Sequence, residues 1–309
     1  MVFCTPPPSP SYPYAMPGAP YGAPFFCLAP YAGKRISSAH ACTGQAQQGI
    51  EKMKSAVIYE GPSRIDGAPI VAIVCKMQSA GKANRKTGDV VQTYILRADV
   101  DPVAAVKTGA DVSVCGDCAH RGAWDADQGR MVGRTCYVNL GQGALSVFRA
   151  YKRGAYPAIT PLAASRIIAG RMVRLGTYGD PAAVPPLKWR ALLHFAAGHT
   201  GYTHQWRRRI AQGLKGLCMA SVETAGEASQ ARAKGWRTFR VAPAAAPNVG
   251  REALCPASKE AGQILQCFDC KACDGASGRR SSIRIAPHGA YASAANLAGL
   301  DARLIARGA

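Results

Sequence analysis

Four cysteines near the C-terminal end constrain this chain more than any other feature. They are Cys255, Cys267, Cys270 and Cys273, and the last three follow one another at Cys-x-x-Cys-x-x-Cys spacing. Thiolates at this spacing converge when the loop folds back, and the fourth completes tetrahedral or cubane ligation. The spacing is more typical of iron–sulfur clusters such as 4Fe–4S than of zinc, for which two separated pairs are usual. We predict a metal site that binds an iron–sulfur cluster, with zinc as the alternative.

Composition agrees with metal binding in a reducing compartment. The chain has 12 cysteines, but its length of 309 residues exceeds that of disulfide-stapled scaffolds. We find no export signal and no transmembrane run. We therefore expect a cytoplasmic protein. The 38 Lys and Arg exceed the 18 Asp and Glu, giving a formal charge of +20. Such an excess attracts polyanions, so we expect nucleic acid or a nucleotide as partner and no membrane.

A second cysteine group precedes the first in the sequence. Cys115 and Cys118 are followed by Cys136, and His120 lies two residues beyond Cys118. This pattern is compatible with a three-cysteine cofactor site that keeps an open coordination position. The alternatives are a zinc site completed by His120, or buried or pairing thiols.

The chain divides into four segments by composition. Residues 1–52 are rich in Pro, Gly and Tyr, which predicts a disordered extension. We expect Met53 to be the start of the native protein. Residues 53–110 predict a β-hairpin, formed by 70–74 and 90–96 around a turn at 85–89, and a short helix that begins after Asp101. Residues 111–250 predict a barrel-like domain, and 251–309 the metal-cluster subdomain and a C-terminal tail.

Helices and strands alternate through the third segment. We predict helices over 143–152, 160–169, 186–197 and 225–234, and strands over 172–175, 201–203, 218–222 and 237–241. Thr224 and Glu227 form a capping box for the last of these helices. The predicted fold class is α/β, a partial (β/α) barrel-like parallel sheet with an N-terminal β-hairpin and a C-terminal cysteine-ligated metal subdomain.

Polar side chains recur where the predicted strands end. They are Asp180, Tyr202, His204 and Glu223. In parallel α/β folds the reactive groups collect at the carboxyl ends of the strands, so we predict these four as catalytic residues. For each one a structural role, such as a helix cap for Asp180, is the alternative.

Two basic clusters lie beside aromatic residues. Lys152 and Arg153 follow Tyr151, and Arg207, Arg208 and Arg209 follow Trp206. Arginine next to aromatic side chains suits phosphate clamping and base stacking, so we predict these five residues as nucleic-acid contacts. A solvated basic face is the alternative.

The order of these motifs resembles a phage family known as gene product 88 and related phage, prophage and plasmid proteins. The likeness covers about residues 110–290 and is carried by Cys115 to Cys136, by Gly179-Asp180, by Tyr202-Thr203 and by the C-terminal cysteines. It implies a phage or mobile-element origin and an architecture, and no particular reaction.

A more distant likeness is to radical-SAM barrels. It implies that Cys115, Cys118 and Cys136 hold a cluster with S-adenosylmethionine as cosubstrate, with the C-terminal cysteines as auxiliary ligands.

Together these features predict a metalloenzyme, with iron–sulfur or zinc, that modifies nucleic acid or a nucleotide. The chemistry can be radical-SAM-like or transglycosylase-like. The alternative is a non-catalytic nucleic-acid-binding protein in which the metal only stabilises the fold.

Overall fold

The computed structural model describes residues 53–79, 84, 86–263, 265–276, 280–289 and 293–306. The predicted extension over residues 1–52 lies outside these residues, and so does Arg85 of the predicted turn.

The first sheet has five strands in the order β1-β2-β3-β6-β7. These strands are β1 (Ser55–Pro62), β2 (Pro69–Cys75), β3 (Val91–Arg97), β6 (Met172–Tyr178) and β7 (Gly198–Thr200). The first three strands are antiparallel, whereas β3, β6 and β7 run parallel. The antiparallel pairing of β2 with β3 confirms the predicted hairpin. Residues Ile70 to Val74 are fully buried, as expected for a run of apolar residues in an inner strand.

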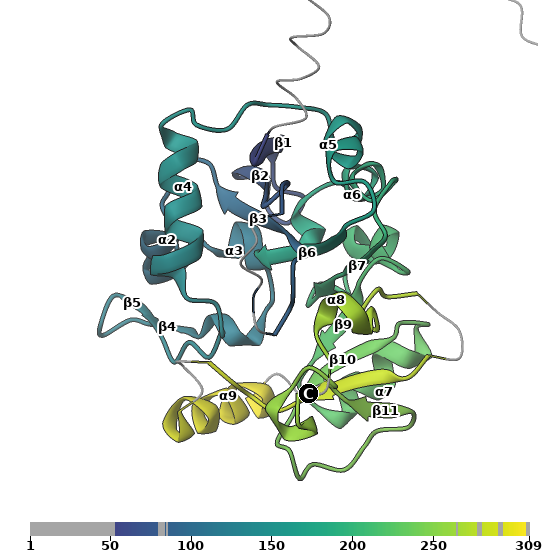
Figure 1. Cartoon of the computed structure of the whole chain (residues 1–309). Coiled ribbons are helices and arrows are strands. Elements are labelled where there is room, and N and C mark those ends of the chain that lie inside the picture. Colours follow the sequence, from purple (N-terminus) through teal and green to yellow (C-terminus); the bar gives the residue numbers. More distant parts are fainter. Residues whose placement is uncertain are drawn as a thin grey trace, which may run out of the picture. The chain divides into compact units, whose positions relative to one another are not determined.

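The second sheet is parallel throughout and has the order β11-β12-β10-β9-β8. Its strands are β8 (Tyr202–Thr203), β9 (Met219–Val222), β10 (Thr238–Val241), β11 (Glu252–Leu254) and β12 (Ser282–Ile285). A two-stranded hairpin, β4 (Ala123–Asp125) and β5 (Arg130–Val132), lies apart from both sheets (Figure 1).

Gly201 is the residue at which the chain passes from one sheet to the other. It separates β7, in the first sheet, from β8, in the second. A Cβ at this position would lie 2.8 Å from Sγ of Cys218 and 2.9 Å from the carbonyl oxygen of Leu217. Because real Cβ atoms do not approach so closely, only glycine fits, and the junction depends on it.

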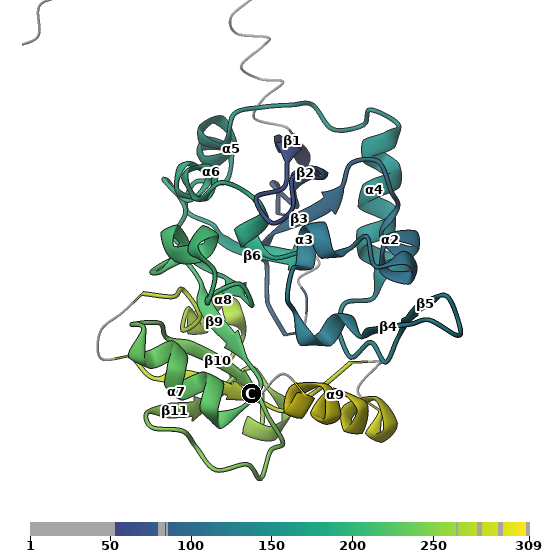
Figure 2. The same ribbon diagram turned by 180° about the vertical axis from the view of Figure 1, so that it is seen from behind.

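The α-helices of the described residues are α2 (Pro102–Thr108), α3 (Val112–Cys115), α4 (Leu145–Lys152), α5 (Pro161–Ile167), α6 (Pro186–Leu192), α7 (Ala225–Ala233), α8 (Cys267–Cys270) and α9 (Ala294–Ala306). Some of them cover both sides of the first sheet. Figures 1 and 2 show α2 and α4 on one side of this sheet and α5 and α6 on the other. In the second sheet, α7 contacts β9 and β10.

Local sequence signals explain where several helices begin and end. The Asp101 side chain caps α2 by accepting hydrogen bonds from the next backbone amides, and the Thr224–Glu227 capping box of α7 is present as predicted. The predicted helix over 186–197 is too long. It ends at Leu192, because the chain must reach β7 at Gly198.

The observed architecture confirms the α/β class and the parallel sheet. The described strands form two sheets, and the partial barrel stays a prediction. In the second sheet, Arg240 on β10 donates hydrogen bonds from Nε and Nη2 to the carboxylate of Glu252 on β11, and both side chains are buried. No helix among the described residues is long and apolar enough to cross a membrane.

Candidate metal centre at the strand ends

Three polar residues lie at the carboxyl ends of β6, β8 and β9. His204 directly follows β8 and Glu223 directly follows β9, while Asp180 follows β6 after one glycine. Hydrogen bonds link all three, from the Thr203 hydroxyl and the His204 amide to Asp180, and between the His204 and Glu223 side chains. The structure therefore brings together three of the four residues predicted as catalytic.

His120, from the short helix η1 (Ala119–Arg121), completes a compact set of ligand atoms with two of them. Among the described residues, His120, His204 and Glu223 form the one group of three or more potential metal ligands whose donor atoms all lie within 4.8 Å of one another. Oε1 of Glu223 is 3.0 Å from Nε2 of His204 and 3.4 Å from Nε2 of His120. Ligand atoms about 2.0–2.2 Å from one tetrahedral ion are separated by about 3.4 Å, so these spacings fit a single ion.

His120 is oriented as a metal ligand requires. Its Nδ1 is 2.8 Å from the hydroxyl oxygen of Thr135, while its Nε2 is buried and makes no hydrogen bond. An imidazole that donates from Nδ1 to Thr135 directs the lone pair of Nε2 toward Glu223 and His204. The Glu223 carboxylate, 3.4 Å away, does not form a hydrogen bond with this nitrogen. A buried nitrogen without a hydrogen bond is costly, and a bound cation would remove that cost.

The chemistry of this donor set matches zinc and related divalent ions. Two imidazoles and one carboxylate are the protein ligands of many catalytic zinc sites, in which the fourth position is left for water or substrate. His120, His204 and Glu223 can therefore hold a metal ion with an open position.

The protonation of His204 and that of Glu223 depend on each other. Burial alone would raise the pKa of the Glu223 carboxyl, but the charge of His204 and the contacts with both imidazoles hold it well below its usual range. Burial opposes protonation of His204, but Cys118 and Glu223 raise its pKa well above the usual value. The neighbouring imidazoles thus favour the ionised form of Glu223.

Asp180 is a buried hydrogen-bond acceptor linked to this group through His204. Its Oδ1 accepts hydrogen bonds from the Ala182 amide at 2.9 Å and the Thr203 hydroxyl at 2.7 Å, and its Oδ2 accepts from the His204 amide at 2.8 Å. Burial raises the pKa of the Asp180 carboxyl, and these hydrogen bonds oppose the rise. The geometry supports the helix-cap alternative, with the added effect that Asp180 fixes the backbone that carries His204.

The second cysteine group lies beside the metal ligands. Sγ of Cys118 is 3.7 Å from Nε2 of His204. Cys115 and Cys136 are partly buried. Desolvation of the thiol is the main reason that the pKa of each is raised, and both interact with Cys118. The sequence pattern groups His120 with these cysteines, whereas in the structure its ligand atom lies within 4.8 Å of those of His204 and Glu223.

Tyr202 lies at a different place from the other predicted catalytic residues. Its ring packs against Phe239, with centroids 4.5 Å apart. Burial, together with the nearby thiols of Cys273 and Cys267, raises the pKa of its hydroxyl well above the usual value. Side chains alternate along a strand, so Tyr202 points toward the C-terminal cysteines while the next residue, Thr203, points toward Asp180.

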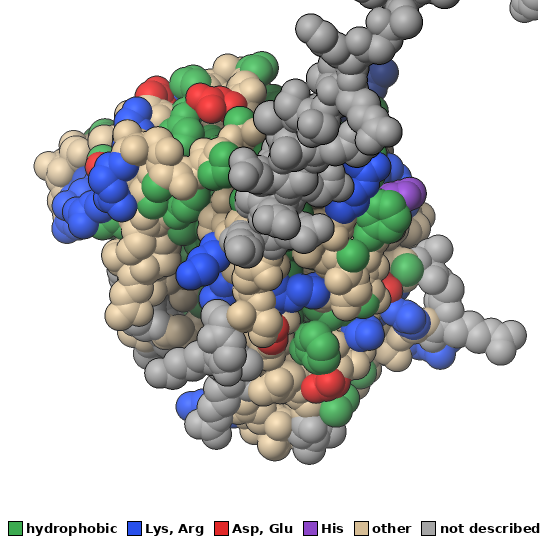
Figure 3. All heavy atoms as spheres, turned by 45° about the horizontal axis from the view of Figure 1, so that its top comes forward, with side chains coloured by type: hydrophobic (Ala, Val, Ile, Leu, Met, Phe, Trp, Pro, Cys, Tyr) green, Lys and Arg blue, Asp and Glu red, His purple; other side chains and the backbone are tan. Residues whose placement is uncertain are grey.

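The five basic residues predicted as nucleic-acid contacts are only partly available to a ligand. Arg207 stacks on the Trp206 ring at 4.0 Å and pairs with Glu227, and Arg208 donates to the backbone of Ile65. Arg209, Lys152 and Arg153 are exposed. On the face in Figure 3, basic side chains occur at several separate places and acidic ones are few.

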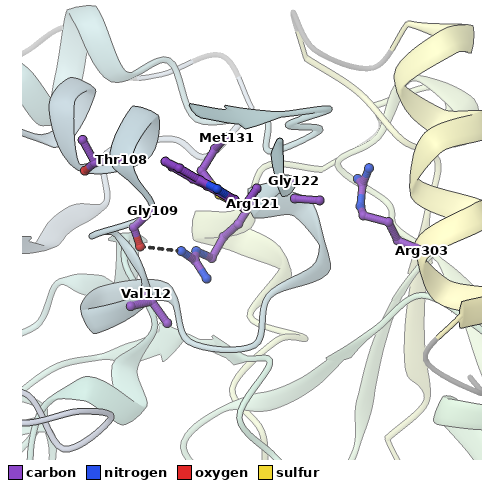
Figure 4. A pocket seen from close by; sticks show the side chains of 9 residues that line it. Thr108, Gly109, Val112, Arg121, Gly122, Met131 and Arg303 are labelled. Carbon is purple, nitrogen blue, oxygen red and sulfur yellow. Dashed lines mark hydrogen bonds between the residues drawn. The ribbon is translucent and has the colours of Figure 1, made fainter. Parts of the chain in front are cut away.

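A cavity opens beside η1. Its volume is about 590 Å³, and its lining includes Arg121, Trp124, Met131 and Arg303. Figure 4 shows Arg121 and Met131 on one side and Arg303, from α9, on the other. Trp124 is 56% exposed. His120 and Arg121 are adjacent, so η1 contributes one residue to the group of potential metal ligands and the next to the lining of the cavity.

Sequence reasoning missed Thr135, Trp124 and Arg303, since no spacing rule connects them to the strand ends. Comparisons of the chain with models of protein families, with curated proteins and with solved structures found no match.

Proposed function

We propose that this protein is a metal-dependent enzyme that modifies nucleic acid or a nucleotide, with its reaction centre at His120, His204 and Glu223. The observation that carries the proposal is the convergence of three ligand atoms, from two strand ends and one loop, within 4.8 Å. A divalent ion bound there would act as a Lewis acid and lower the pKa of a bound water.

The residues around the ion have separate roles in this proposal. Thr135 holds the imidazole of His120 in the tautomer that binds metal, and Asp180 fixes the backbone at His204. Such partners of the ligands determine both metal affinity and ligand orientation. Cys118, 3.7 Å from His204 Nε2, is close enough to be a further ligand after a small movement.

The substrate class is proposed from charge and from the cavity beside η1. The formal charge of +20 favours a polyanionic substrate. Trp124 exposes more than half of its surface in a cavity that Arg121 and Arg303 also line. An exposed indole is a stacking surface for a base, and the volume of about 590 Å³ lies within the range of small-molecule sites.

The proposal includes a cysteine-ligated metal subdomain at Cys255, Cys267, Cys270 and Cys273. Cys255, Cys267 and Cys273 pack in one apolar cluster with Met219, and Cys270 ends the helical turn that Cys267 begins. We also retain a phage or mobile-element origin as part of this proposal, on the strength of the motif order alone.

The test compares turnover and binding in the same protein. Metal-loaded protein is incubated with single-stranded DNA, RNA and free nucleotides, and products are identified by mass spectrometry. We expect conversion that a chelator, His204→Ala and Glu223→Gln each abolish, while exposed His194→Ala leaves it unchanged. Binding without conversion, lost on replacement of Arg207, Arg208 and Arg209 by Ala but not in the two site variants, would instead establish a non-catalytic nucleic-acid-binding protein.

A further inference from the structure

Arg174 is a charged residue in an inner strand of the first sheet. It lies on β6, between β3 and β7, and its side chain is half-buried while its neighbours Val173 and Leu175 are fully buried. Arg240 has a similar position in the second sheet, where the buried carboxylate of Glu252 neutralises it. Because burial of an unpaired charge is costly, a guanidinium so placed needs an anion as partner.

The hydrogen-bond partner of Arg174 is neutral. Nη2 donates to the hydroxyl of Tyr137, and the centroid of that ring is 5.7 Å from Cζ of Arg174. Nε is buried and makes no hydrogen bond. A phenol hydroxyl accepts one hydrogen bond but brings no counterion, so the guanidinium keeps its charge and an unsatisfied donor.

A second cation is connected to Arg174 through two stacked rings. Nζ of Lys86 is 3.2 Å from Nε2 of His288, and the His288 ring stacks on Tyr137 with centroids 5.5 Å apart. Nδ1 of His288 is 3.0 Å from the carbonyl oxygen of Ala286, so the imidazole donates there and accepts from Lys86. Burial is the main reason that the pKa of His288 is lowered, and Lys86 and Arg174 both contribute, so both charges act on the same ring.

Gly289 allows the segment that carries His288 to approach Tyr137. A Cβ at this glycine, whose φ is +102°, would lie 2.9 Å from Cα of Tyr137. Such an approach excludes any other residue. The Tyr137 side chain is 44% exposed, so the group formed by these residues is open to solvent.

The charges around this group favour an anion. Among the residues that the structure describes, neither Lys86 nor Arg174 forms an ion pair with a carboxylate. Glu260, whose charge acts on His288, is exposed, so solvent screens it. Burial raises the pKa of the Cys267 thiol, and both cations oppose the rise. Stabilisation of a Cys267 thiolate is therefore the alternative role of the two cations.

We propose that Arg174, Lys86 and the Tyr137 hydroxyl bind a phosphate group. A guanidinium presents several donors to phosphate oxygens, and an ammonium adds a point charge. The Tyr137 hydroxyl accepts from Arg174 and keeps its own proton to donate to a phosphate oxygen. This phosphate site goes beyond the proposed function, since it shares no residue with the metal centre or with the five basic residues predicted as nucleic-acid contacts.

The test is isothermal titration calorimetry of the full chain with inorganic phosphate at low ionic strength. Lys86→Gln and Arg174→Gln are compared with the matched controls Lys188→Gln on α6 and Arg166→Gln on α5. We expect each site variant to weaken binding by about tenfold or more, as for loss of a charge-assisted hydrogen bond, and each control by less than about twofold. Circular dichroism shows whether each variant is folded. Lys86 lies in a turn outside the strands, so Lys86→Gln is decisive even where Arg174→Gln destabilises β6.

A dinucleotide identifies the source of the phosphate group. Thymidylyl-thymidine has one phosphodiester and no free phosphate, so its competition with inorganic phosphate assigns the site to a nucleic-acid backbone. Binding of inorganic phosphate alone assigns the site to a free phosphate group.

Equal phosphate affinity of the parent and Lys86→Gln overturns the proposal and leaves the two cations as partners of the Cys267 thiolate. A parent that does not bind phosphate also overturns it. Neither result bears on the N/O site, the metal centre formed by His120, His204 and Glu223, because that site is tested by His204→Ala.

Discussion

Oε1 of Glu223 lies 3.0 Å from Nε2 of His204, although the two residues are 19 positions apart and follow different strands. Adjacent parallel strands end at the same edge of a sheet, and β8 and β9 are adjacent. The topology of the second sheet therefore places the imidazole and the carboxylate together, and η1 contributes His120 next to them.

Removal of one ligand should eliminate the N/O metal site. We expect His120→Ala to weaken metal binding there by more than about 100-fold, because even the loss of a ligand's hydrogen-bond partner costs about 10–100-fold. Titration with Co²⁺ measures this, since absorption without sulfur charge transfer separates the N/O site from thiolate sites. His194→Ala, at an exposed histidine, should bind as the parent does; equal affinity for His120→Ala would exclude this nitrogen as a ligand.

Asp180→Asn should affect both stability and metal affinity. The substitution places an amide group where the carboxylate now accepts from Ala182, Thr203 and His204. Since hydrogen bonds to a charged group contribute about 1.5–3 kcal/mol, we expect unfolding free energy to fall by about 2–3 kcal/mol in urea denaturation. Metal affinity should fall about tenfold, because His204 loses its support. Unchanged stability and affinity, with activity lost, would instead assign Asp180 a direct catalytic role.

How much of this structure the sequence predicts depends on how far apart along the chain the residues that determine each feature lie. The strand-end positions of Asp180, His204 and Glu223, and the capping box at Thr224, follow from patterns within a few residues, and the structure brings them together as such patterns indicate. The division into two sheets does not. It depends on Gly201, which must be glycine because Cys218, just before β9, lies too close for a Cβ. The contact of His120 with Glu223 is likewise determined by the packing of a loop, and loop packing produces no periodic pattern in the sequence.

Gly201→Ala should destabilise the junction between the sheets. Its Cβ would lie 2.8 Å from Sγ of Cys218 and 2.9 Å from a backbone oxygen, which a small shift cannot relieve. We expect a loss of about 1–3 kcal/mol, as for overpacked cores. Gly226→Ala, inside α7 and with its nearest neighbour at 3.9 Å, should have the opposite sign and stabilise by about 0.5–1 kcal/mol. Thermal unfolding of both variants measures the difference, and two changes of the same sign would contradict the account.

Glu252→Gln should be strongly destabilising. Glu252 is the buried partner of Arg240, and removal of its charge leaves the guanidinium buried without a counterion. We expect a loss of about 3–5 kcal/mol in denaturant unfolding. Asp99→Asn breaks a pair whose carboxylate is 48% exposed and should cost less than about 1 kcal/mol. Comparable costs for the two variants would show that burial is not what makes the Arg240 pair important.

Trp124→Ala should weaken binding of a nucleotide or single-stranded oligonucleotide while leaving metal binding intact. The loss of one stacking surface costs about 1–3 kcal/mol, or about 5–150-fold in Kd. Fluorescence anisotropy with a labelled oligonucleotide measures it. Leu187→Ala, at a residue that is 76% exposed, controls for the loss of exposed apolar surface. Equal affinity of Trp124→Ala and Leu187→Ala would remove the cavity beside η1 from the substrate site.

The most direct test of the central claim is a crystal structure of zinc-loaded protein, with anomalous difference maps collected on both sides of the zinc absorption edge. We predict an edge-dependent peak about 2.0–2.2 Å from Nε2 of His120, Nε2 of His204 and a carboxylate oxygen of Glu223. A map of well-ordered protein with no peak among these three side chains would contradict the proposed metal centre.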